Sequence, residues 1–420
     1  MLTANSPGEV AAWLTPAVRA IKVKMPDAKI TVCIPPCTFA SGTECAVAGA
    51  LPEVDLVLTP RSVFSFLAGA RPPAGWRPGP KGVVCFLGGD MLYGVLLARR
   101  LGYPALAYTE GRARWHHKYS RFLVPDEQAQ RRAEQDGAGA DQVSIIGDLM
   151  LDAVRPCAKD QESSRALLHE SADALLLALF PGSRPFEVQS FMPFFSRVAQ
   201  IVVKAIDKPI NVVISLSPFV NPASLQAAAT VVPVGYEGVT GAITPMPLPG
   251  TTAQVWQFST KCLNIKVVQG LQYDVMQACD LAVTVPGSNT AEMAYLGVPM
   301  VVALPLNRPE DIPLEGLVGL IGNLPLVGPA IKRVAVSKVA SKLRFAALPN
   351  KKARRQVVPE VRGKLQPADI AIPVVDLLQR PERLQTIRRN LQELMGEAGA
   401  AERLATEVLA LAAAGQRRGK

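Results

Sequence analysis

Two short turns in the second half of the chain contain residues suited to binding an anion. Residues 181–184 read Pro-Gly-Ser-Arg after the apolar run 174–180, and residues 286–288 read Pro-Gly-Ser after the apolar run 281–285. A turn that opens a helix presents backbone N–H groups without helical partners, and these favour phosphate. Glycine allows close approach to the backbone, and Arg184 can pair with phosphate oxygens. Each turn alone is also typical of an ordinary strand-to-helix connection capped by serine.

A carboxylate follows the second turn at Glu292, in the first turn or so of the expected helix. There it can accept hydrogen bonds from the paired hydroxyls of a ribose; the alternative is an acid favoured only by the helix dipole. Two phosphate-type turns and this carboxylate together predict a nucleotide-diphosphate site. The candidate nucleotide-binding residues are Gly182, Ser183, Arg184, Gln269, Gly287, Ser288, Asn289, Thr290 and Glu292.

Two acidic residues in the first half are candidates for a general base. Asp90 follows the apolar run 83–87 and two glycines, at the strand end where α/β sheets bind ligands. It could accept a proton from an attacking hydroxyl, or it could simply cap the helix that begins near Met91. Glu9, in a Pro-Gly-Glu turn, is the second candidate.

No metal site is expected from the side chains available. The chain has three histidines, and Cys33, Cys37 and Cys45 lack both zinc-like spacing and a nearby histidine. Buried, reduced thiols are the better interpretation of these cysteines.

The order of apolar and helical patterns predicts an α/β fold with parallel sheets. The expected strands are 29–34, 56–58, 83–87, 105–108, 121–124, 143–146, 174–180, 211–216, 265–268, 281–285 and 299–303. The helical spacing of apolar residues in 188–206 indicates a core helix. Residues 220–262 are rich in Pro, Gly and Thr and predict no clear element.

A chain of 420 residues exceeds the size of a single core, so two domains are expected. The predicted boundaries are 1–160 for an N-terminal Rossmann-like domain and 172–395 for a second one. The polar stretch 155–172 is interpreted as their connection. Residues 396–420 are expected to form a C-terminal helix that packs back across the domains.

Charge and hydropathy suggest where the protein acts. The net charge is +10, and residues 332–364 hold 11 basic residues and one acid. This block favours an anionic partner such as a membrane surface, or it is merely a solvated helix face. No pattern of stacking aromatics accompanies it, so nucleic acid is not expected. Residues 61–67 form either an apolar surface helix or a core helix. No signal pattern is present, and a cytoplasmic protein, with peripheral attachment to the inner face of the membrane as a further hypothesis, is expected.

A colinear series of motifs resembles the lipid-A-disaccharide synthases over about residues 80–410. The matching segments are Pro181–Glu187, Pro286–Glu292, Leu296–Val302, Asn323–Pro325, Val358–Glu360, Pro381–Arg383 and Gly399–Arg403. The resemblance implies a GT-B fold, with two facing Rossmann-like domains and a cleft between them. It also implies inverting transfer of a GlcNAc-type sugar from a UDP-sugar to a lipid or glycolipid acceptor, with no metal and no other cofactor.

The first half matches that family less closely. Its first loop has only Pro7-Gly8-Glu9 where the family has Gly-Glu-x-Ser-Gly-Asp, and Asp148 replaces the usual His. Acceptors bind this half in the family, so the departures concern the acceptor more than the donor. One alternative is a UDP-GlcNAc 2-epimerase, which the scarcity of His disfavours. Another is a non-catalytic relative that binds a nucleotide sugar or a lipid.

Overall fold

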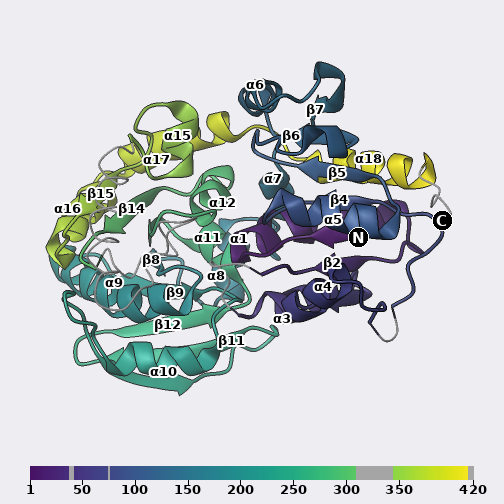
Figure 1. Cartoon of the computed structure of the whole chain (residues 1–420). Helices are drawn as coiled ribbons and strands as arrows, with labels where there is room; N and C mark the ends of the chain where they lie inside the picture. Colours follow the sequence, from purple (N-terminus) through teal and green to yellow (C-terminus); the bar gives the residue numbers. More distant parts are fainter. Residues whose placement is uncertain (37–41, 74–75, 309–343, 415–420) are drawn as a thin grey trace. The chain divides into compact units, whose positions relative to one another are not determined.

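The computed structural model describes residues 1–36, 42–73, 76–308 and 344–414. These divide into two compact units (Figure 1). Unit 1 comprises Met1–Ala153 together with Glu397–Lys420, and unit 2 comprises Val154–Gly396. Cys37, the segment Asn323–Pro325 and the first part of the basic block, residues 332–343, lie outside the described residues.

Unit 1 is built on a seven-stranded, fully parallel sheet in the order β3-β2-β1-β4-β5-β6-β7. The strands are β1 Leu2–Thr3, β2 Thr31–Cys33, β3 Leu56–Leu58, β4 Val84–Phe86, β5 Ala105–Tyr108, β6 Arg121–Val124 and β7 Val143–Ile145. Every expected strand of this half is present, shortened by at most a few residues at its ends. After β1 the chain adds β2 and β3 on one side of this strand, and it then crosses over to add β4 on the other side. The strand order therefore reverses between β1 and β4.

Helices connect the strands of unit 1 and cover the sheet. They are α1 Pro7–Glu9, the π-helix η1 Val10–Leu14, α2 Thr15–Lys24, α3 Glu44–Gly49, α4 Pro60–Leu67, α5 Met91–Leu101, the 3₁₀ helices η2 His116–Lys118 and η3 Ala140–Gln142, α6 Glu127–Gln135, α7 Leu149–Ala153 and α18 Ala400–Ala414. Both ends of α5 are determined by nearby residues. Asp90 caps its first turn, and Gly102 ends it in the left-handed conformation that glycine adopts readily.

The C-terminal helix α18 belongs to unit 1, where it packs on α2 and α7. The Asp152 carboxylate accepts hydrogen bonds from the N–H groups of Gly399 (2.6 Å) and Ala401 (2.8 Å), at the start of this helix. Arg403 donates from Nε to the carbonyl of Ile146 at 2.7 Å. The motif 399–403 of the sequence resemblance is therefore held by hydrogen bonds to Ile146 and Asp152.

Unit 2 contains an eight-stranded sheet in the order β10-β11-β12-β9-β8-β13-β14-β15. Its strands are β8 Leu175–Phe180, β9 Ile210–Leu216, β10 Gly241–Pro245, β11 Gln254–Thr260, β12 Asn264–Gln269, β13 Leu281–Thr284, β14 Met300–Pro305 and β15 Glu360–Gly363. The expected parallel pairing is confirmed for the six strands from β12 to β15 in this order, and β10 and β11 extend the sheet by antiparallel pairing at the β12 side. The extra strands come from residues 220–262, where the sequence predicted no element.

The helices of unit 2 are α8 Gln161–Leu167, α9 Pro185–Ala205, α10 Pro222–Thr230, α11 Gln272–Ala278, α12 Asn289–Tyr295, α15 Leu348–Ala353, α16 Pro367–Leu378 and α17 Pro381–Met395. The predicted core helix is confirmed as α9, in which Met192, Phe195 and Val198 are completely buried. No described helix is both long enough and apolar enough to cross a bilayer.

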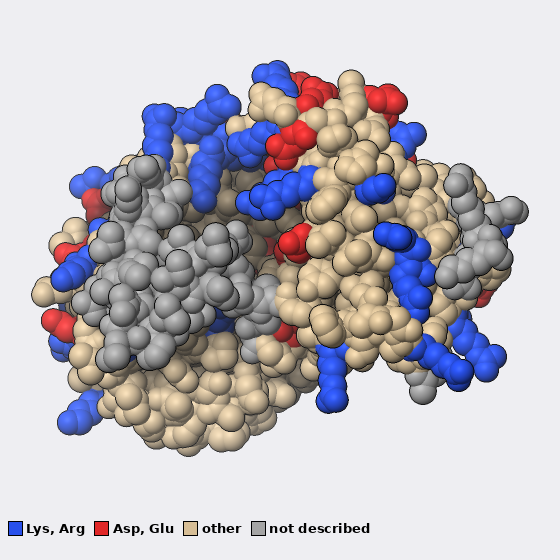
Figure 2. Space-filling view, in the orientation of Figure 1, with Lys and Arg blue, Asp and Glu red and all other residues tan. Residues whose placement is uncertain are grey.

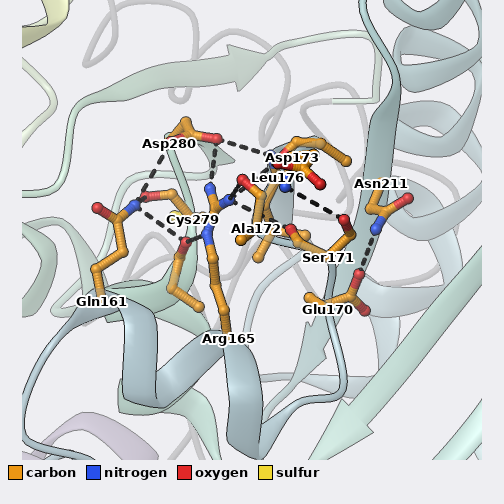
Figure 3. A network of polar contacts seen from close by, with 12 residues as sticks. Gln161, Arg165, Glu170, Ser171, Ala172, Asp173, Leu176, Asn211, Cys279 and Asp280 are labelled. Atoms are coloured by element: carbon orange, nitrogen blue, oxygen red, sulfur yellow. Dashed lines mark hydrogen bonds and ion pairs between the residues drawn. The ribbon is translucent and has the colours of Figure 1, made fainter.

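The stretch interpreted as a connection instead contains α8, which packs on α11 within unit 2. Arg165 fixes it there (Figure 3). Its guanidinium donates to the Asp280 carboxylate at 2.7 Å and to the carbonyls of Ala278 and Ala174 at 3.0 Å each. Asp280 also accepts the N–H of Leu176 at 2.8 Å. This network connects α8 to the amino-terminal ends of β8 and β13. The turns described next follow the carboxyl ends of the same two strands.

Candidate functional site

The two Pro-Gly-Ser turns of unit 2 follow neighbouring strands. β8 and β13 pair in parallel, with Phe180 opposite Thr284, and each strand leads directly into its turn. The chain runs from β8 towards β9 on one side and returns to β13 on the other, so the strand order reverses between them. Ligands of open α/β sheets bind at the carboxyl ends of strands at this kind of point. The structure thus brings residues 182–184 and 287–290 to the same position in the fold.

The first turn is filled by a side chain that the sequence reasoning did not assign. The Glu187 carboxylate accepts hydrogen bonds from the N–H groups of Ser183 (2.8 Å) and Arg184 (3.0 Å) through Oε2. Its Oε1 accepts from Nη1 of Arg184 at 2.9 Å. Gly182 has φ of +114°, and a Cβ there would lie 2.4 Å from Oε2. The N–H groups that the sequence offered to a phosphate are therefore bound by Glu187, which leaves the Arg184 guanidinium as the candidate phosphate contact of this turn.

A recognisable sequence signal exists for this arrangement. Pro185 occupies the first position of α9 and Glu187 the third, which is the spacing of a capping box. An acid three residues beyond Arg184 can reach these N–H groups, and this spacing predicts an internal cap in place of a ligand.

The second turn keeps its shape through its own side chains. Thr290 is fully buried; its hydroxyl donates to the Gly287 carbonyl at 2.8 Å and accepts the N–H of Leu348 at 3.2 Å. Asn289 donates from Nδ2 to the Thr284 hydroxyl at 2.5 Å. Ser288 forms no side-chain cap at the start of α12. Gly287 is exposed, so the backbone of this turn is open to a ligand.

Glu292 lies one helical turn beyond, on α12, and only 6% of its surface is exposed. Burial raises the pKa of its carboxyl group to about 7. Within the described ranges, no hydrogen bond or ion pair is made by this carboxylate. Burying such a group without partners costs free energy, and titratable groups in this situation are concentrated at functional sites. Glu292 can supply an acceptor for ligand hydroxyl groups beside the Gly287 turn.

Gln269 is separated from the two turns by strand β9. It ends β12 opposite Leu216, and its side-chain amide donates to the carbonyls of Ser217 (2.8 Å) and Val220 (2.9 Å). The structure therefore gives this side chain a role in fixing the loop between β9 and α10.

In unit 1 the candidate bases also lie where the strand order reverses, at the ends of β1 and β4. The Glu9 carboxylate accepts the N–H groups of Asn5 (2.9 Å) and Ser6 (3.1 Å) through Oε2, and that of Gly89 (3.0 Å) through Oε1. Burial raises the pKa of Glu9, although these hydrogen bonds oppose the change. A Cβ at Gly88 would lie 2.1 Å from the Glu9 Cδ, so glycine is required where the carboxylate crosses this loop.

Asp90 follows Gly89 directly, so both candidate bases lie at the carboxyl ends of β1 and β4. Its Oδ1 accepts the N–H of Leu92 at 2.9 Å, so the capping interaction predicted as the alternative is present. Capping uses one carboxylate oxygen, and the residue remains exposed. Asp90 is thus more accessible to a substrate than Glu9.

Helix α1 of unit 1 and helix α9 of unit 2 begin in the same way. Ser6-Pro7-Gly8-Glu9 and Arg184-Pro185-Phe186-Glu187 each place proline at the first helical position and glutamate at the third. In both, one carboxylate oxygen accepts the N–H groups three and four residues before it. An internal carboxylate therefore occupies the N-terminus of the helix that follows β1 in unit 1 and β8 in unit 2.

The chain is similar in sequence to several curated proteins. No family model matches the chain. It is 27% identical over 283 residues to a lipid-A-disaccharide synthase of Syntrophus aciditrophicus, covering 65% of this chain and 58% of that protein. Another, from Geobacter sulfurreducens, is 27% identical over 271 residues, covering 64% and 56%. The chain thus spans less than two thirds of the length of these curated relatives.

Solved structures agree on the fold. The UDP-GlcNAc 2-epimerase of Neisseria meningitidis, bound to UDP-GlcNAc, superposes with a TM-score of 0.55 at 12% identity, covering 97% of this chain and 99% of that chain. MurG of Acinetobacter baumannii gives 0.50 at 14%, covering 98% and 99%. At such identities the likeness shows the fold alone. The chain has a GT-B fold made of two Rossmann-like domains, and it is a distant relative of the lipid-A-disaccharide synthases.

Proposed function

We propose that this protein is an inverting glycosyltransferase that moves a GlcNAc-type sugar from UDP to a lipid or glycolipid acceptor. The observation that carries the proposal is Glu292, a buried carboxylate without a partner among the described residues, beside an open Gly-Ser turn at the strand-order reversal of unit 2. The curated relatives named lipid-A-disaccharide synthase support the reaction class.

In the proposed reaction, an acceptor hydroxyl oxygen attacks the anomeric carbon of the sugar. The new C–O bond forms as the bond to the diphosphate breaks, and UDP carries away the electron pair. Asp90 accepts the hydroxyl proton, with Glu9 as the second candidate. Arg184 and the backbone N–H groups at the Ser288 turn stabilise charge on the departing diphosphate, and Glu292 accepts hydrogen bonds from the ribose. No metal or further cofactor is invoked.

A UDP-GlcNAc 2-epimerase is the second candidate, because several solved structures with this fold carry that activity in their names. The two reactions leave different products. An epimerase changes the configuration at C2 and keeps the sugar on UDP, whereas a transferase releases UDP and labels the acceptor. Incubation of the protein with radiolabelled UDP-sugars and total lipid extract distinguishes them. A labelled lipid supports transfer, and a labelled C2 epimer without lipid product overturns it.

Donor binding is tested separately by calorimetry with UDP. Replacing Glu292 by Ala should weaken UDP binding at least tenfold, or about 1.4 kcal/mol, because the ribose loses its acceptor. Glu237→Ala is the matched control, since Glu237 is an exposed acid of the same unit. Unchanged UDP affinity in the Glu292 variant would remove this residue from the site.

A further inference from the structure

The loop after β1 contains a buried side-chain amide that makes no hydrogen bond to any described residue. Asn5 is only 5% exposed, and its backbone N–H donates to Glu9, but the described part of the chain offers its side chain no partner. The amide still reaches the surface, because Glu53 Oε2 is the one described side-chain atom that is fully buried without a hydrogen bond. Burying an amide without a partner costs free energy, so folding alone does not explain Asn5.

A second buried asparagine shows what a structural role requires. Asn350 of α15 is completely buried. Its Nδ2 donates to the Val358 carbonyl at 2.9 Å and to Glu360 Oε1 at 2.7 Å, and its Oδ1 accepts the N–H groups of Val357 (2.6 Å) and Val358 (3.0 Å). This amide holds the segment between α15 and β15 in place. Within the described ranges, the Asn5 side chain has no comparable task, and it remains available to a ligand.

The Asn5 amide lies against the glycine loop that follows β4. A Cβ at Gly89 would lie 2.6 Å from Nδ2 and 3.0 Å from Cγ of Asn5, and Gly89 also has φ of +90°, so glycine is required there. The Glu9 carboxylate accepts the N–H groups of both Asn5 and Gly89, which fixes the two loops to each other. Asp90 is the next residue. The unpartnered amide and the candidate base therefore lie close together at the carboxyl ends of β1 and β4.

The charges of these loops favour a neutral hydroxyl group over a phosphate. Residues 1–18 and 82–98, which contain the two loops and their flanking elements, include two acids and no lysine or arginine. Lys and Arg side chains gather instead over α15 and α17 of unit 2 (Figure 2), where Lys351 and Arg389 are exposed. A carboxylate without a neighbouring cation repels an anion. A hydroxyl group, in contrast, can donate to the carboxylate and accept from the amide.

We propose that the Asn5 amide binds the attacking hydroxyl group of the acceptor and directs its proton towards Asp90. One lone pair of the hydroxyl oxygen accepts an N–H of Asn5, and the other attacks the anomeric carbon. Capping of α5 uses Oδ1 of Asp90, so Oδ2 accepts the proton as the new C–O bond forms and UDP leaves with the bonding electrons. Holding the hydroxyl at two points lowers the entropic part of the barrier. This role rests on the proposed transferase function.

Asn5→Leu tests the role, because leucine keeps the approximate shape of asparagine and removes its hydrogen-bonding groups. With radiolabelled UDP-GlcNAc and total lipid extract, the kcat for label transfer should fall about tenfold, the loss expected for one hydrogen bond to the reacting group. The KM for UDP-GlcNAc and the affinity for UDP should stay unchanged. Asn5→Ser, which retains a short donor, should recover part of the turnover. Gln128→Ala, an exposed amide on α6 of the same unit, is the control and should behave like the wild type.

Urea denaturation separates a contact with the acceptor from a packing role. Asn5→Leu removes no side-chain hydrogen bond of the described structure and places an apolar group where an unpartnered amide was buried. Its unfolding midpoint should therefore stay the same or rise. Asn350→Ala is the opposite case, because the hydrogen bonds of its amide are lost, and its midpoint should fall.

Two results would overturn the role of Asn5. One is full turnover in Asn5→Leu. The other is a loss of turnover that accompanies a fall in the unfolding midpoint as large as that of Asn350→Ala, which would make Asn5 a structural residue. The proposed function fails in a different way: a wild-type protein that labels no lipid refutes the transferase activity and this role with it, whereas equal labelling by the wild type and Asn5→Leu refutes only the role of Asn5.

Discussion

At the scale of single residues, the protonation state of Glu292 should control recognition of the ribose. Because burial raises its pKa to about 7, the carboxyl group is mostly protonated at pH 6 and mostly ionised at pH 8. The ionised form is the stronger acceptor for hydroxyl groups. Ligand affinity at this residue should therefore increase as pH rises through 7.

Uridine is the suitable probe for this prediction, because the terminal phosphate of UDP itself titrates in the same range, near a pKa of about 6. Uridine affinity should rise several-fold from pH 6 to pH 8 in the wild type. In Glu292→Gln it should be weak and independent of pH. An identical pH profile in the two proteins, measured by calorimetry, would show that another group titrates.

Asp90 can act as a helix cap and as a general base, and one substitution distinguishes the two roles. Asparagine also caps helices, so Asp90→Asn should keep the hydrogen bond to the Leu92 N–H and leave thermal stability and UDP binding nearly unchanged. As a base, however, asparagine is inert, and turnover with a competent acceptor should fall on the order of 10²-fold or more. If most of the activity survives, the capping role is the whole role of Asp90, and Glu9 becomes the leading candidate.

At the scale of elements, the start of α9 depends on Glu187. Glu187→Ala removes the acceptor for the N–H groups of Ser183 and Arg184 and should lower the free energy of unfolding by about 1–2 kcal/mol. Urea denaturation measures this change. Gln189→Ala, an exposed position in the same first turns of α9, is the control and should change stability by only a few tenths of a kcal/mol. A Glu187 variant as stable as this control would contradict the capping role.

The same scale shows what the sequence could and could not predict. Strands β5, β6 and β3 were predicted to the residue, because each is a short apolar run between turn residues. Strand β10 was missed because it lies at the edge of the sheet and its Gly241 and Pro245 resemble loop residues. Strand β11 lies between β10 and β12, and its mixture of buried and partly exposed residues gives no continuous apolar run. Helix α8 looked like a linker because its key contact, Arg165 with Asp280, joins residues 115 apart in sequence.

Site prediction followed the same pattern. The two Pro-Gly-Ser turns were found from local sequence, and the pairing of β8 with β13 brings them together. The hydrogen bonds from the first turn to Glu187 could have been inferred from the three-residue spacing between Arg184 and Glu187. The hydrogen bond between Gly89 and Glu9 could not, because it joins residues 80 apart and depends on the pairing of β1 with β4.

At the scale of the whole molecule, Asp152 fastens the C-terminal helix to unit 1. Asp152→Ala removes the acceptor of two N–H groups at the start of α18, of which the Ala401 N–H is buried and that of Gly399 is partly buried, and leaves both unpaired. We expect faster proteolysis between Gly396 and Ala400 and a lower midpoint of thermal unfolding, with UDP binding by unit 2 retained. Glu397→Ala, an exposed acid in the same segment, should leave both measurements unchanged. Equal protease resistance in the two variants would contradict this role of Asp152.

Because unit 2 is inserted between the two parts of unit 1, the order of synthesis on the ribosome acquires a structural meaning. Residues 1–153 emerge first, but the face of α2 that α18 covers has no partner until about 240 further residues have been translated. At synthesis rates of about 5–20 residues per second, that interval lasts roughly 10–50 s. During this time the nascent N-terminal unit exposes apolar surface, which makes it a natural client for chaperones that act during translation.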